Sequence, residues 1–204
     1  MTKMNKGRLI VLSAPSGCGK GTMLEQILKD ESFFCSISAT TRAPRENEID
    51  GKNYYFISRE EFRKLIAENG VLEYAEYCGN YYGTPLKPVN EMLENGKNVI
   101  LEIEVKGAMK VKKLRPDTLM IFILPPSVAE LRRRLNKRGT ESAEVIEARV
   151  AEAASEIKIA SQYDYVIVND ALEVAVNDFK AIIKAESMKT EFAGELIDEV
   201  IKNA

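Results

Sequence analysis

The sequence predicts an α/β fold built on a parallel β-sheet, and two observations carry that prediction. Four short apolar runs, at residues 8–13, 98–103, 118–124 and 164–168, lack the alternation of a half-exposed strand. Such runs are typical of strands buried on both faces of a parallel sheet. Each of the last three is reached through a segment that is compatible with a helix, and strands that alternate with helices indicate a parallel sheet between helical layers.

Length and composition fit one core with modest insertions. The chain has 204 residues, of which 45% are hydrophobic and 29% are charged, and this balance is too apolar for a disordered chain. Histidine is absent. Catalysis by Ser-His-Asp or Cys-His groups and metal sites with histidine ligands are therefore excluded, and any chemistry must use carboxylates, Lys, Arg, hydroxyls, thiols and backbone groups.

Charge and cysteine content restrict the partners and the compartment. The net charge of −2 offers no global attraction to a nucleic acid polymer, which is therefore not expected as a partner. Cys18, Cys35 and Cys78 are odd in number and widely spaced, as in a protein of the reducing cytoplasm. The longest stretch without charge, residues 118–129, is shorter than the ~20 residues that span a bilayer, so no membrane partner is expected.

A glycine-rich turn follows the first strand and precedes helical spacing of apolar residues. Strand, turn, lysine and helix in this order form the plan of a P-loop, in which backbone N–H groups surround phosphates and Lys20 reaches the terminal ones. The predicted ATP-binding residues here are Ala14, Pro15, Ser16, Gly17, Cys18, Gly19, Lys20, Gly21 and Thr22.

The turn departs from the pattern G-x-x-x-x-G-K-[ST] at two positions. Ala14 replaces the first glycine, and Gly21 replaces the hydroxyl residue after the lysine, so that Thr22 comes one position late. A magnesium ion would then rest on waters, on Thr22, or on the carboxylates Glu102 and Glu104 after the strand that begins near residue 98. We name Thr22 and Glu102 as the candidate metal residues, with contact through water left open.

Two segments interrupt the alternation of strands and helices. Residues 38–96 are polar and rich in tyrosine, with short strands expected around a helix at 59–69, and residues 128–163 are charged and helical, with a break at 138–140 and few apolar residues to anchor them. The core then comprises residues 1–37, 97–127 and 164–204. The amphipathic segment after Glu186 is expected to pack on this core in preference to binding a partner.

Three motifs carry a resemblance to a known family: residues 38–45 (SATTRAPR), 50–56 (DGKNYYF) and 79–84 (GNYYGT). They resemble the guanylate kinases, and the similarity extends over nearly the whole chain. The resemblance implies a P-loop NTPase fold of three α/β/α layers, with an α+β insertion that binds GMP at 38–96 and a helical lid at 128–163. It also implies transfer of the γ-phosphoryl group of ATP to GMP, with Mg²⁺ bound together with ATP. Lys-Gly-Thr at 20–22 resembles the adenylate kinase turn.

The expected GMP site combines cations with one carboxylate. Pro44 restricts Ala43 to extended geometry, so that Arg42 and Arg45 can converge on one phosphate. An ionised carboxylate only accepts hydrogen bonds, and Glu73 can therefore accept both guanine donors, N1–H and N2–H. From the resemblance, the further GMP contacts are Ser38, Tyr54, Tyr82, Thr84 and Glu104, with Ser38 and Thr84 donating to guanine O6.

The lid contributes the remaining predicted residues. Residues 130–138 hold five basic side chains and one acidic one, a composition that usually marks only a solvated helix face. The resemblance places Arg134, Arg138 and Arg149 at the ATP phosphates and the transferring group. It also places Asn169 near the adenine. Gly139 is a candidate hinge. The predicted catalytic residues are Lys20, Arg45, Arg134, Arg138 and Arg149.

Two other functions were weighed. Guanylate-kinase-like domains without catalysis act as binding modules, but such domains typically lose the loop lysine or the lid arginines that this sequence keeps. A switch GTPase is disfavoured because no Asn-Lys-x-Asp motif is present. No general base is needed for phosphoryl transfer to a phosphate oxygen, which is already ionised at pH 7. The sequence leaves the oligomeric state open.

Overall fold

A computed structural model gives the fold of residues 6–138, 142–190 and 194–202, which are the residues described below. Its core is a five-stranded sheet in the order β2-β7-β1-β8-β9, and every pairing in it is parallel. The strands are β1 (Leu9–Ser13), β2 (Phe33–Cys35), β7 (Asn98–Glu102), β8 (Leu119–Leu124) and β9 (Tyr165–Val168). The predicted fold class, an α/β protein of the P-loop type, is confirmed.

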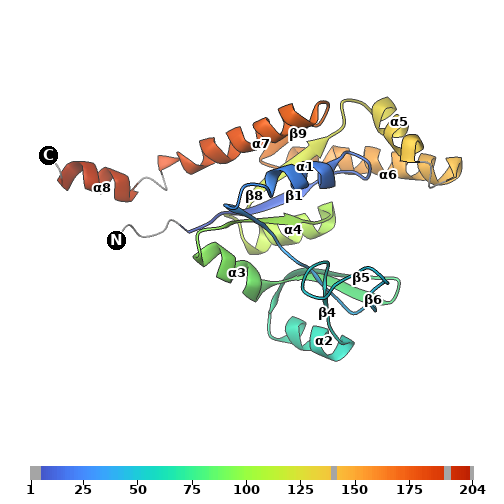
Figure 1. The fold of residues 1–204 in the computed structure, drawn as a ribbon, viewed down its shortest axis with the longest axis horizontal. Coiled ribbons are helices and arrows are strands. Elements are labelled where there is room, and N and C mark those ends of the chain that lie inside the picture. The colour runs from blue at the N-terminus through green and yellow to red at the C-terminus, as the bar shows by residue number, and fades with distance from the viewer. Residues whose placement is uncertain (1–5, 139–141, 191–193, 203–204) are drawn as a thin grey trace.

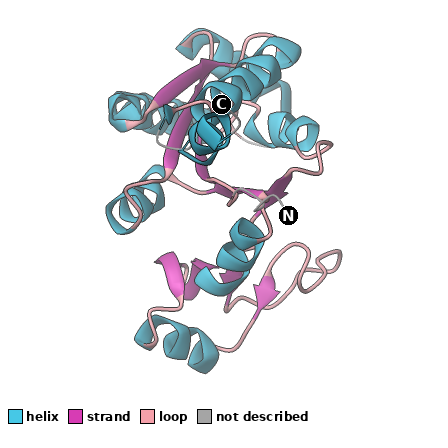
Figure 2. Ribbon diagram, turned by 90° about the vertical axis from the view of Figure 1, so that its left-hand side faces the viewer, coloured by secondary structure: helices cyan, strands magenta, loops and turns pink. Residues whose placement is uncertain are grey.

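Burial on both faces explains why these strands read as continuous apolar runs. Along β1, Ile10 and Leu12 pack into one apolar cluster and Leu9 and Val11 into another. The first cluster is covered by α1 (Lys20–Ile27), α5 (Val128–Arg138), α6 (Ala143–Ile159) and α7 (Leu172–Ser187); the second is covered by α3 (Leu86–Glu94) and α4 (Val105–Leu114). Figure 2 shows this sheet between helices.

A second, smaller sheet forms a separate lobe next to the core. Its strands are β3 (Ala39–Thr40), β4 (Tyr55–Phe56), β5 (Val71–Tyr77) and β6 (Asn80–Pro85), in the order β4-β3-β6-β5, and the helix α2 (Arg59–Ala67) covers it. Ser58 caps α2 through a reciprocal capping box with Glu61, which explains where the helix begins. The short strands and the helix expected within 38–96 are therefore present, but α3, a second helix in the same segment, was not predicted, and it packs on the core sheet.

The edge strand β2 was missed by the sequence analysis. Phe33, Phe34 and Cys35 pair with β7, but three residues are too few to give a recognisable apolar run. The short helical turn η1 (Ala160–Gln162), which leads from α6 into β9, was also not predicted.

Residues 128–163 hold few apolar residues, as the sequence indicates, but these few anchor both helices to the core. Leu131 and Leu135 of α5 are buried, and so are Ile146 and Val150 of α6, all within the cluster that covers one face of the core sheet. Few apolar residues suffice because they recur at helical spacing on the inner faces of the two helices. The break expected at 138–140 includes Gly139, which lies outside the described residues.

The C-terminal segment also departs from expectation. Its helix α8 (Gly194–Lys202) lies beyond the end of α7 and away from both sheets (Figure 1). Ile197, Val200 and Ile201 of this helix are exposed and do not pack on the core; Phe192 lies outside the described residues. Of the described helices, none combines the length and the apolar character needed to cross a bilayer.

A buried ion pair ties α7 to the start of β1. The carboxylate of Glu186 accepts hydrogen bonds from Arg8 Nη1 at 2.8 Å and from the Tyr165 hydroxyl at 2.7 Å, and only 2% of its side chain is exposed. Burial alone would raise the pKa of Glu186, but hydrogen bonds from Lys189 and Tyr165, together with the charges of Lys189 and Arg8, outweigh it and lower the pKa.

Substitution of Glu186 by Ala should lower the free energy of unfolding by roughly 3 kcal/mol, because it removes a buried carboxylate from the largely buried Arg8 guanidinium, whose side chain is 17% exposed. Urea denaturation measures this change. Since the folded-state pKa of Glu186 is lowered, its stabilisation is present above the unfolded-state pKa and is lost as the pH falls through the folded-state pKa. The Glu91→Ala variant, which breaks an exposed pair with Lys87, is the control and should change stability by less than about 0.5 kcal/mol. An equal loss in both variants would contradict the assignment.

Candidate active site

The turn between β1 and α1 forms a phosphate cradle. Gly17 and Gly19 have φ of +91° and +79°, a backbone conformation that residues with a side chain rarely adopt. A Cβ on Gly17 would lie 2.9 Å from Leu135 of α5, and one on Gly19 would lie 2.6 Å from the Asn169 side chain. Both positions therefore require glycine, for conformation and for space. The loop leads into α1, whose first N–H groups and dipole favour an anion.

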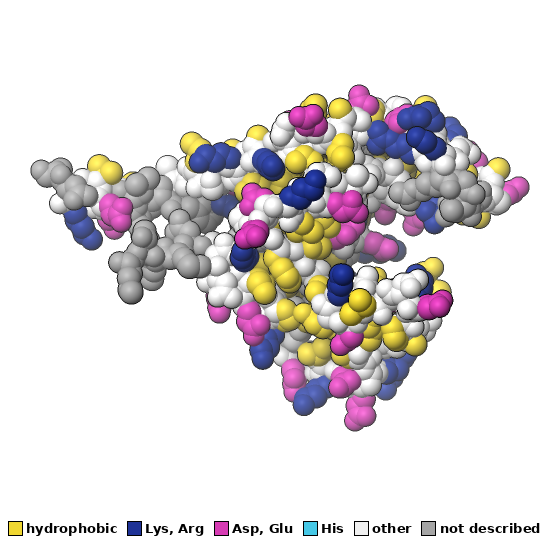
Figure 3. Space-filling view, in the orientation of Figure 1, with side chains coloured by type: hydrophobic (Ala, Val, Ile, Leu, Met, Phe, Trp, Pro, Cys, Tyr) yellow, Lys and Arg dark blue, Asp and Glu magenta, His cyan; other side chains and the backbone are white. Residues whose placement is uncertain are grey.

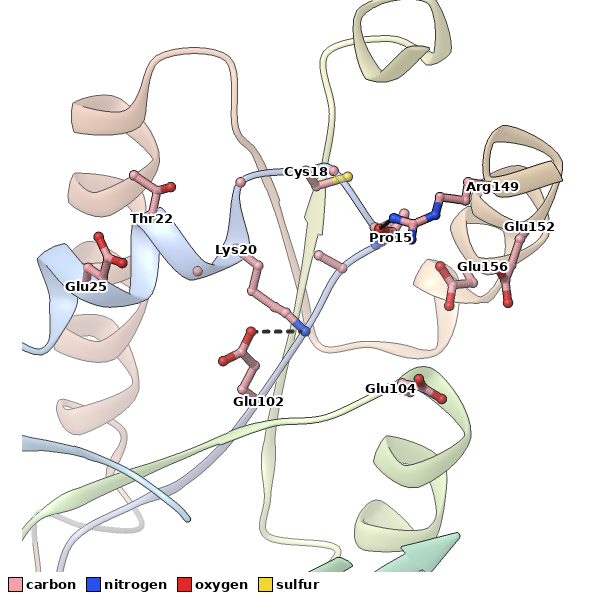
Figure 4. A pocket seen from close by; sticks show the side chains of 15 residues that line it. Pro15, Cys18, Lys20, Thr22, Glu25, Glu102, Glu104, Arg149, Glu152 and Glu156 are labelled. Carbon is pink, nitrogen blue, oxygen red and sulfur yellow. Dashed lines mark hydrogen bonds and ion pairs between the residues drawn. The ribbon is translucent and has the colours of Figure 1, made fainter. Parts of the chain in front are cut away.

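A cleft of about 530 Å³ opens over this loop. It is lined by the residues 14–22, all of them predicted to bind ATP, and by Arg149 and five glutamates, namely Glu25, Glu102, Glu104, Glu152 and Glu156. Figure 4 shows the cleft from close by, with Lys20 directed at Glu102. The Lys20 ammonium lies 3.6 Å from the Glu102 carboxylate, so the predicted catalytic lysine and the candidate metal residue meet.

The carboxylates of this cleft repel one another. Burial raises the pKa of Glu156, and the nearby charges of Glu152 and Glu104 raise it further, while Lys20 acts in the opposite sense. Glu152 and Glu156 are on α6, whereas Glu104 lies at the start of α4 (Figure 4). A nucleotide polyphosphate entering without a cation would therefore meet negative charge from two elements.

Arginines of α5 and α6 contact the loop and the core. Arg149 of α6 donates to the Ser16 hydroxyl at 3.0 Å, which brings α6 to the cradle. Arg134 of α5 donates to the backbone carbonyl of Asn169 at 2.9 Å and forms an ion pair with Glu130 at 2.8 Å. Arg138 is the last residue of α5, and its side chain lies outside the described part of the chain.

The Asn169 side chain contacts the backbone of the phosphate loop. Its amide nitrogen donates to the Cys18 carbonyl at 2.7 Å, and its side chain packs against Gly19. Only 5% of Asn169 is exposed. The amide thus fixes the loop backbone, a role that the sequence analysis did not foresee, while the predicted position near adenine stays a prediction. Burial raises the pKa of the Cys18 thiol to about 12, so this cysteine stays protonated.

The smaller lobe gathers the predicted phosphate-binding residues of the second site. The Arg42 guanidinium lies 5.7 Å from the centre of the Tyr54 ring, and the Tyr54 and Tyr82 rings are 6.1 Å apart. Arg45 is exposed in the same loop, and its backbone N–H donates to Glu48 at 2.8 Å. Three of these side chains are thus close together, with Arg45 beside them.

Glu48 was not identified from the sequence. Its two carboxylate oxygens accept hydrogen bonds from the two terminal nitrogens of Arg42, each at 2.9 Å. The bond from Arg42 and that from the Arg45 backbone lower the pKa of Glu48 to about 2. The only sequence signal was an acidic residue three positions after Arg45 in a polar loop, which is too common to be informative.

Glu73 and Thr84 form a second group on the neighbouring strands β5 and β6. The Thr84 hydroxyl, which is buried, donates to the Glu73 carboxylate at 2.9 Å. Burial raises the pKa of Glu73, and the Thr84 hydrogen bond and the Lys110 charge partly offset this rise. Since Thr84 already donates to Glu73, its predicted bond to guanine O6 stays a prediction. Ser38 lies just before β3, where its carbonyl accepts from Tyr55 at 2.9 Å.

Helix α4 connects the two groups. Its N-cap residue Glu104 lines the cleft over the loop, and Gly107, three residues on, lies against the Glu73 carboxylate. The space-filling view in Figure 3 shows a hollow between the part that carries α5 and α6 and the smaller lobe. The predicted sites for two anionic ligands thus face one molecular hollow from opposite sides.

The fold and the cradle define a P-loop protein that carries a second, smaller lobe. Comparison with known proteins gives the family. Residues 6–186 match the guanylate kinase family, and the chain belongs to it. It is 54% identical to the guanylate kinase of Carboxydothermus hydrogenoformans over 91% of this chain and 92% of that one, and 53% identical to that of Halalkalibacterium halodurans with the same coverage.

A solved structure gives the same result. The crystal structure of guanylate kinase from Anaplasma phagocytophilum matches with a TM-score of 0.71 and 38% identity, over 91% of this chain and 89% of that one. The helix α8 lies beyond the residues that match the family.

The pairing of Arg42 with Glu48 gives a prediction about pKa. In the Arg42→Ala variant the pKa of Glu48 should rise from about 2 toward its ordinary value, because the main hydrogen-bond donor is removed. Carbon-detected NMR of the glutamate carboxyl groups during a pH titration measures it. Arg59→Ala, which removes the partner of Glu76, is the control and should leave the Glu48 titration unchanged. A Glu48 pKa near 2 in Arg42→Ala would contradict the pairing.

Proposed function

We propose that the chain transfers the γ-phosphoryl group of ATP to GMP and gives ADP and GDP. The observation that carries this proposal is the position of α4, which begins at the phosphate cleft and one turn later lies against the half-buried Glu73 carboxylate. One helical turn therefore separates a site suited to a polyphosphate from a site suited to guanine. Membership of the guanylate kinase family supports both substrates.

The ATP phosphates are proposed to occupy the cradle. Backbone N–H groups of Ser16, Gly17 and Gly19 and the N-terminus of α1 surround them. Lys20 and Arg149 add positive charge. Arg134 and Arg138 belong to the same proposed set, together with Asn169 near the adenine. Phosphoryl transfer passes through a transition state with charge spread over the phosphoryl oxygens, so that catalysis is mainly alignment and electrostatic stabilisation.

Magnesium fits the oxygen donors of this cleft. Among the described residues no group of three acidic, cysteine or histidine side chains could hold a metal alone, whereas the Thr22 hydroxyl and the Glu102 carboxylate both line the cleft. Mg²⁺ usually keeps waters and binds through one or two protein groups and substrate phosphates. We propose that Thr22 and Glu102 hold the ion in this way; once bound, it would neutralise phosphate charge that the five glutamates otherwise repel.

The smaller lobe is proposed to bind GMP. Arg42, Arg45, Tyr54 and Tyr82 surround its phosphate, since planar guanidinium groups and phenolic donors suit a phosphate dianion. The phosphate of GMP then competes with the Glu48 carboxylate, which forms an ion pair with Arg42 in the protein without ligand. The acceptor oxygen of GMP is already ionised at pH 7, so the transfer needs no general base and no histidine.

Guanine is proposed to be read by Glu73. Its two oxygens accept from N1–H and N2–H at once, whereas adenine offers no such pair and would leave the partly buried carboxylate without donors from the base. Ser38, Thr84 and Glu104 complete the base site. Residues 1–37, 97–127 and 164–204 then form the core, 38–96 the GMP-binding part and 128–163 the lid.

We also propose a cytoplasmic location, no nucleic acid polymer as partner and no membrane association. The three free thiols, Cys18, Cys35 and Cys78, fit a reducing compartment. A catalytically inactive binding module is not favoured, because Lys20 and Arg149 lie at the loop as catalysis requires.

A coupled assay for ADP tests the proposed reaction. With ATP, Mg²⁺ and GMP the protein should form ADP and GDP, and replacement of GMP by AMP or UMP should lower kcat/KM by at least about 1,000-fold, because either base leaves Glu73 without its paired donors. GDP is identified by chromatography. Absence of ADP with GMP would remove the proposal, and equal rates with AMP would remove the role of Glu73.

Replacement of Lys20 by Ala should lower kcat by at least about 100-fold, because it removes a fixed positive charge from the transferring phosphoryl group. Steady-state kinetics measures the loss, and circular dichroism checks the fold. The Lys87→Ala variant, whose side chain is exposed on α3, is the control and should keep wild-type kcat. Turnover near wild type in Lys20→Ala would take the lysine out of the catalytic set.

A further inference from the structure

Gly107 is a glycine inside a helix without a conformational reason for it. It is the third residue of α4, and it is not among the residues with positive φ. Glycine is a poor helix former, because it loses more backbone freedom than other residues and has no side chain to pack. Alanine would be the better residue for α4 itself, so the reason for glycine must lie in its surroundings.

The nearest neighbour of Gly107 in these surroundings is the Glu73 side chain. The three atoms nearest to a Cβ on Gly107 would all belong to Glu73: its Oε2 at 3.0 Å, its Cδ at 3.4 Å and its Cγ at 3.6 Å. A contact at 3.0 Å is tighter than nine in ten Cβ contacts, so the Glu73 carboxylate would have to shift by a few tenths of an ångström. The Glu73 carboxylate therefore occupies space that a side chain at position 107 would need.

The other side of Glu73 is also fixed. Its Oε1 accepts from the buried Thr84 hydroxyl at 2.9 Å, and this bond holds one oxygen while Gly107 borders the other. Oε2 lies at the first turn of α4, where free N–H groups and the helix dipole favour negative charge. The carboxylate plane is thus set by Thr84 on one side and by a bare helical turn on the other.

We propose that Gly107 is a specificity-determining residue, which acts by leaving room for the Glu73 carboxylate to present both oxygens to guanine. This inference rests on the proposed function of Glu73. Two parallel hydrogen bonds need both oxygens in the plane of the guanine edge. Since a misplacement of about 1 Å costs about 100-fold in activity, a displacement of a few tenths of an ångström is expected to cost on the order of tenfold. Gly107 itself is a positioning residue, since it acts through Glu73.

The test is a double-mutant cycle with Gly107→Ala and Glu73→Gln, with kcat and KM measured for GMP and for AMP. In the wild-type background, Gly107→Ala should raise KM for GMP at least tenfold and leave the kinetics with AMP within twofold. In the Glu73→Gln background, the same alanine should change KM for GMP by less than twofold, because the pair of acceptor oxygens whose position it disturbs is already lost.

Stability separates this role from a structural one. Gly107→Ala should not lower the melting temperature, because alanine favours the helix. If the melting temperature does fall, the double variant Glu73→Asp, Gly107→Ala should restore it, because the shorter aspartate leaves room for the methyl group of Ala at position 107. Lys113→Ala, exposed on the same helix, is the control and should match the wild type in every measurement.

Three results would overturn the inference. They are an unchanged KM for GMP in Gly107→Ala, an equal fold-change of this KM in both backgrounds, and a lower melting temperature that Glu73→Asp does not restore. An equal fold-change would mean that the new methyl group acts without Glu73. A wild-type protein that lacks activity with GMP would refute the proposed function instead, so the two failures are distinguishable.

Discussion

The parallel pairing of β1 with both of its neighbours is the constraint on which the site depends. Because β7 and β8 lie on either side of β1, all three strands end at the same edge of the sheet. The phosphate loop leaves from the end of β1, and Glu102 ends β7. The Ser13 hydroxyl, at the last position of β1, donates to the Ile103 carbonyl at 2.8 Å and fixes the two strand ends together. The groups at the cleft owe their proximity to this register.

Fixed charge then determines what the two lobes can bind. Each proposed phosphate site holds an arginine or lysine that is paired with a carboxylate, Lys20 with Glu102 and Arg42 with Glu48. Such a pair keeps the cation in place and limits the cost of its partial burial before an anion arrives. The absence of histidine, which excluded several mechanisms at the start, fits a reaction that depends on alignment and permanent charge rather than proton transfer.

Much of the fold could be predicted from sequence, because buried parallel strands and a glycine-rich loop leave local patterns. β2 could not, since three residues carry no periodicity. The failure of α8 to pack on the core could not either, because an amphipathic pattern shows that a helix has an apolar face but not what covers it. In the site, the residue types of the loop were informative by themselves, whereas Glu73 was found through the resemblance to the guanylate kinases. The roles of Glu48, Asn169 and Gly107 depend on contacts between segments distant in sequence or on local geometry that sequence spacing does not encode.

The central claim is that one carboxylate, Glu73, recognises two donors of guanine at once. Isothermal titration calorimetry with GMP and with inosine 5′-monophosphate tests it most directly, because the second nucleotide keeps N1–H and O6 and lacks only the N2 amino group. A lost hydrogen bond to a charged acceptor is worth about 1.5–3 kcal/mol, so the inosine nucleotide should bind on the order of 10- to 100-fold more weakly than GMP. Equal affinity for the two nucleotides would contradict the account.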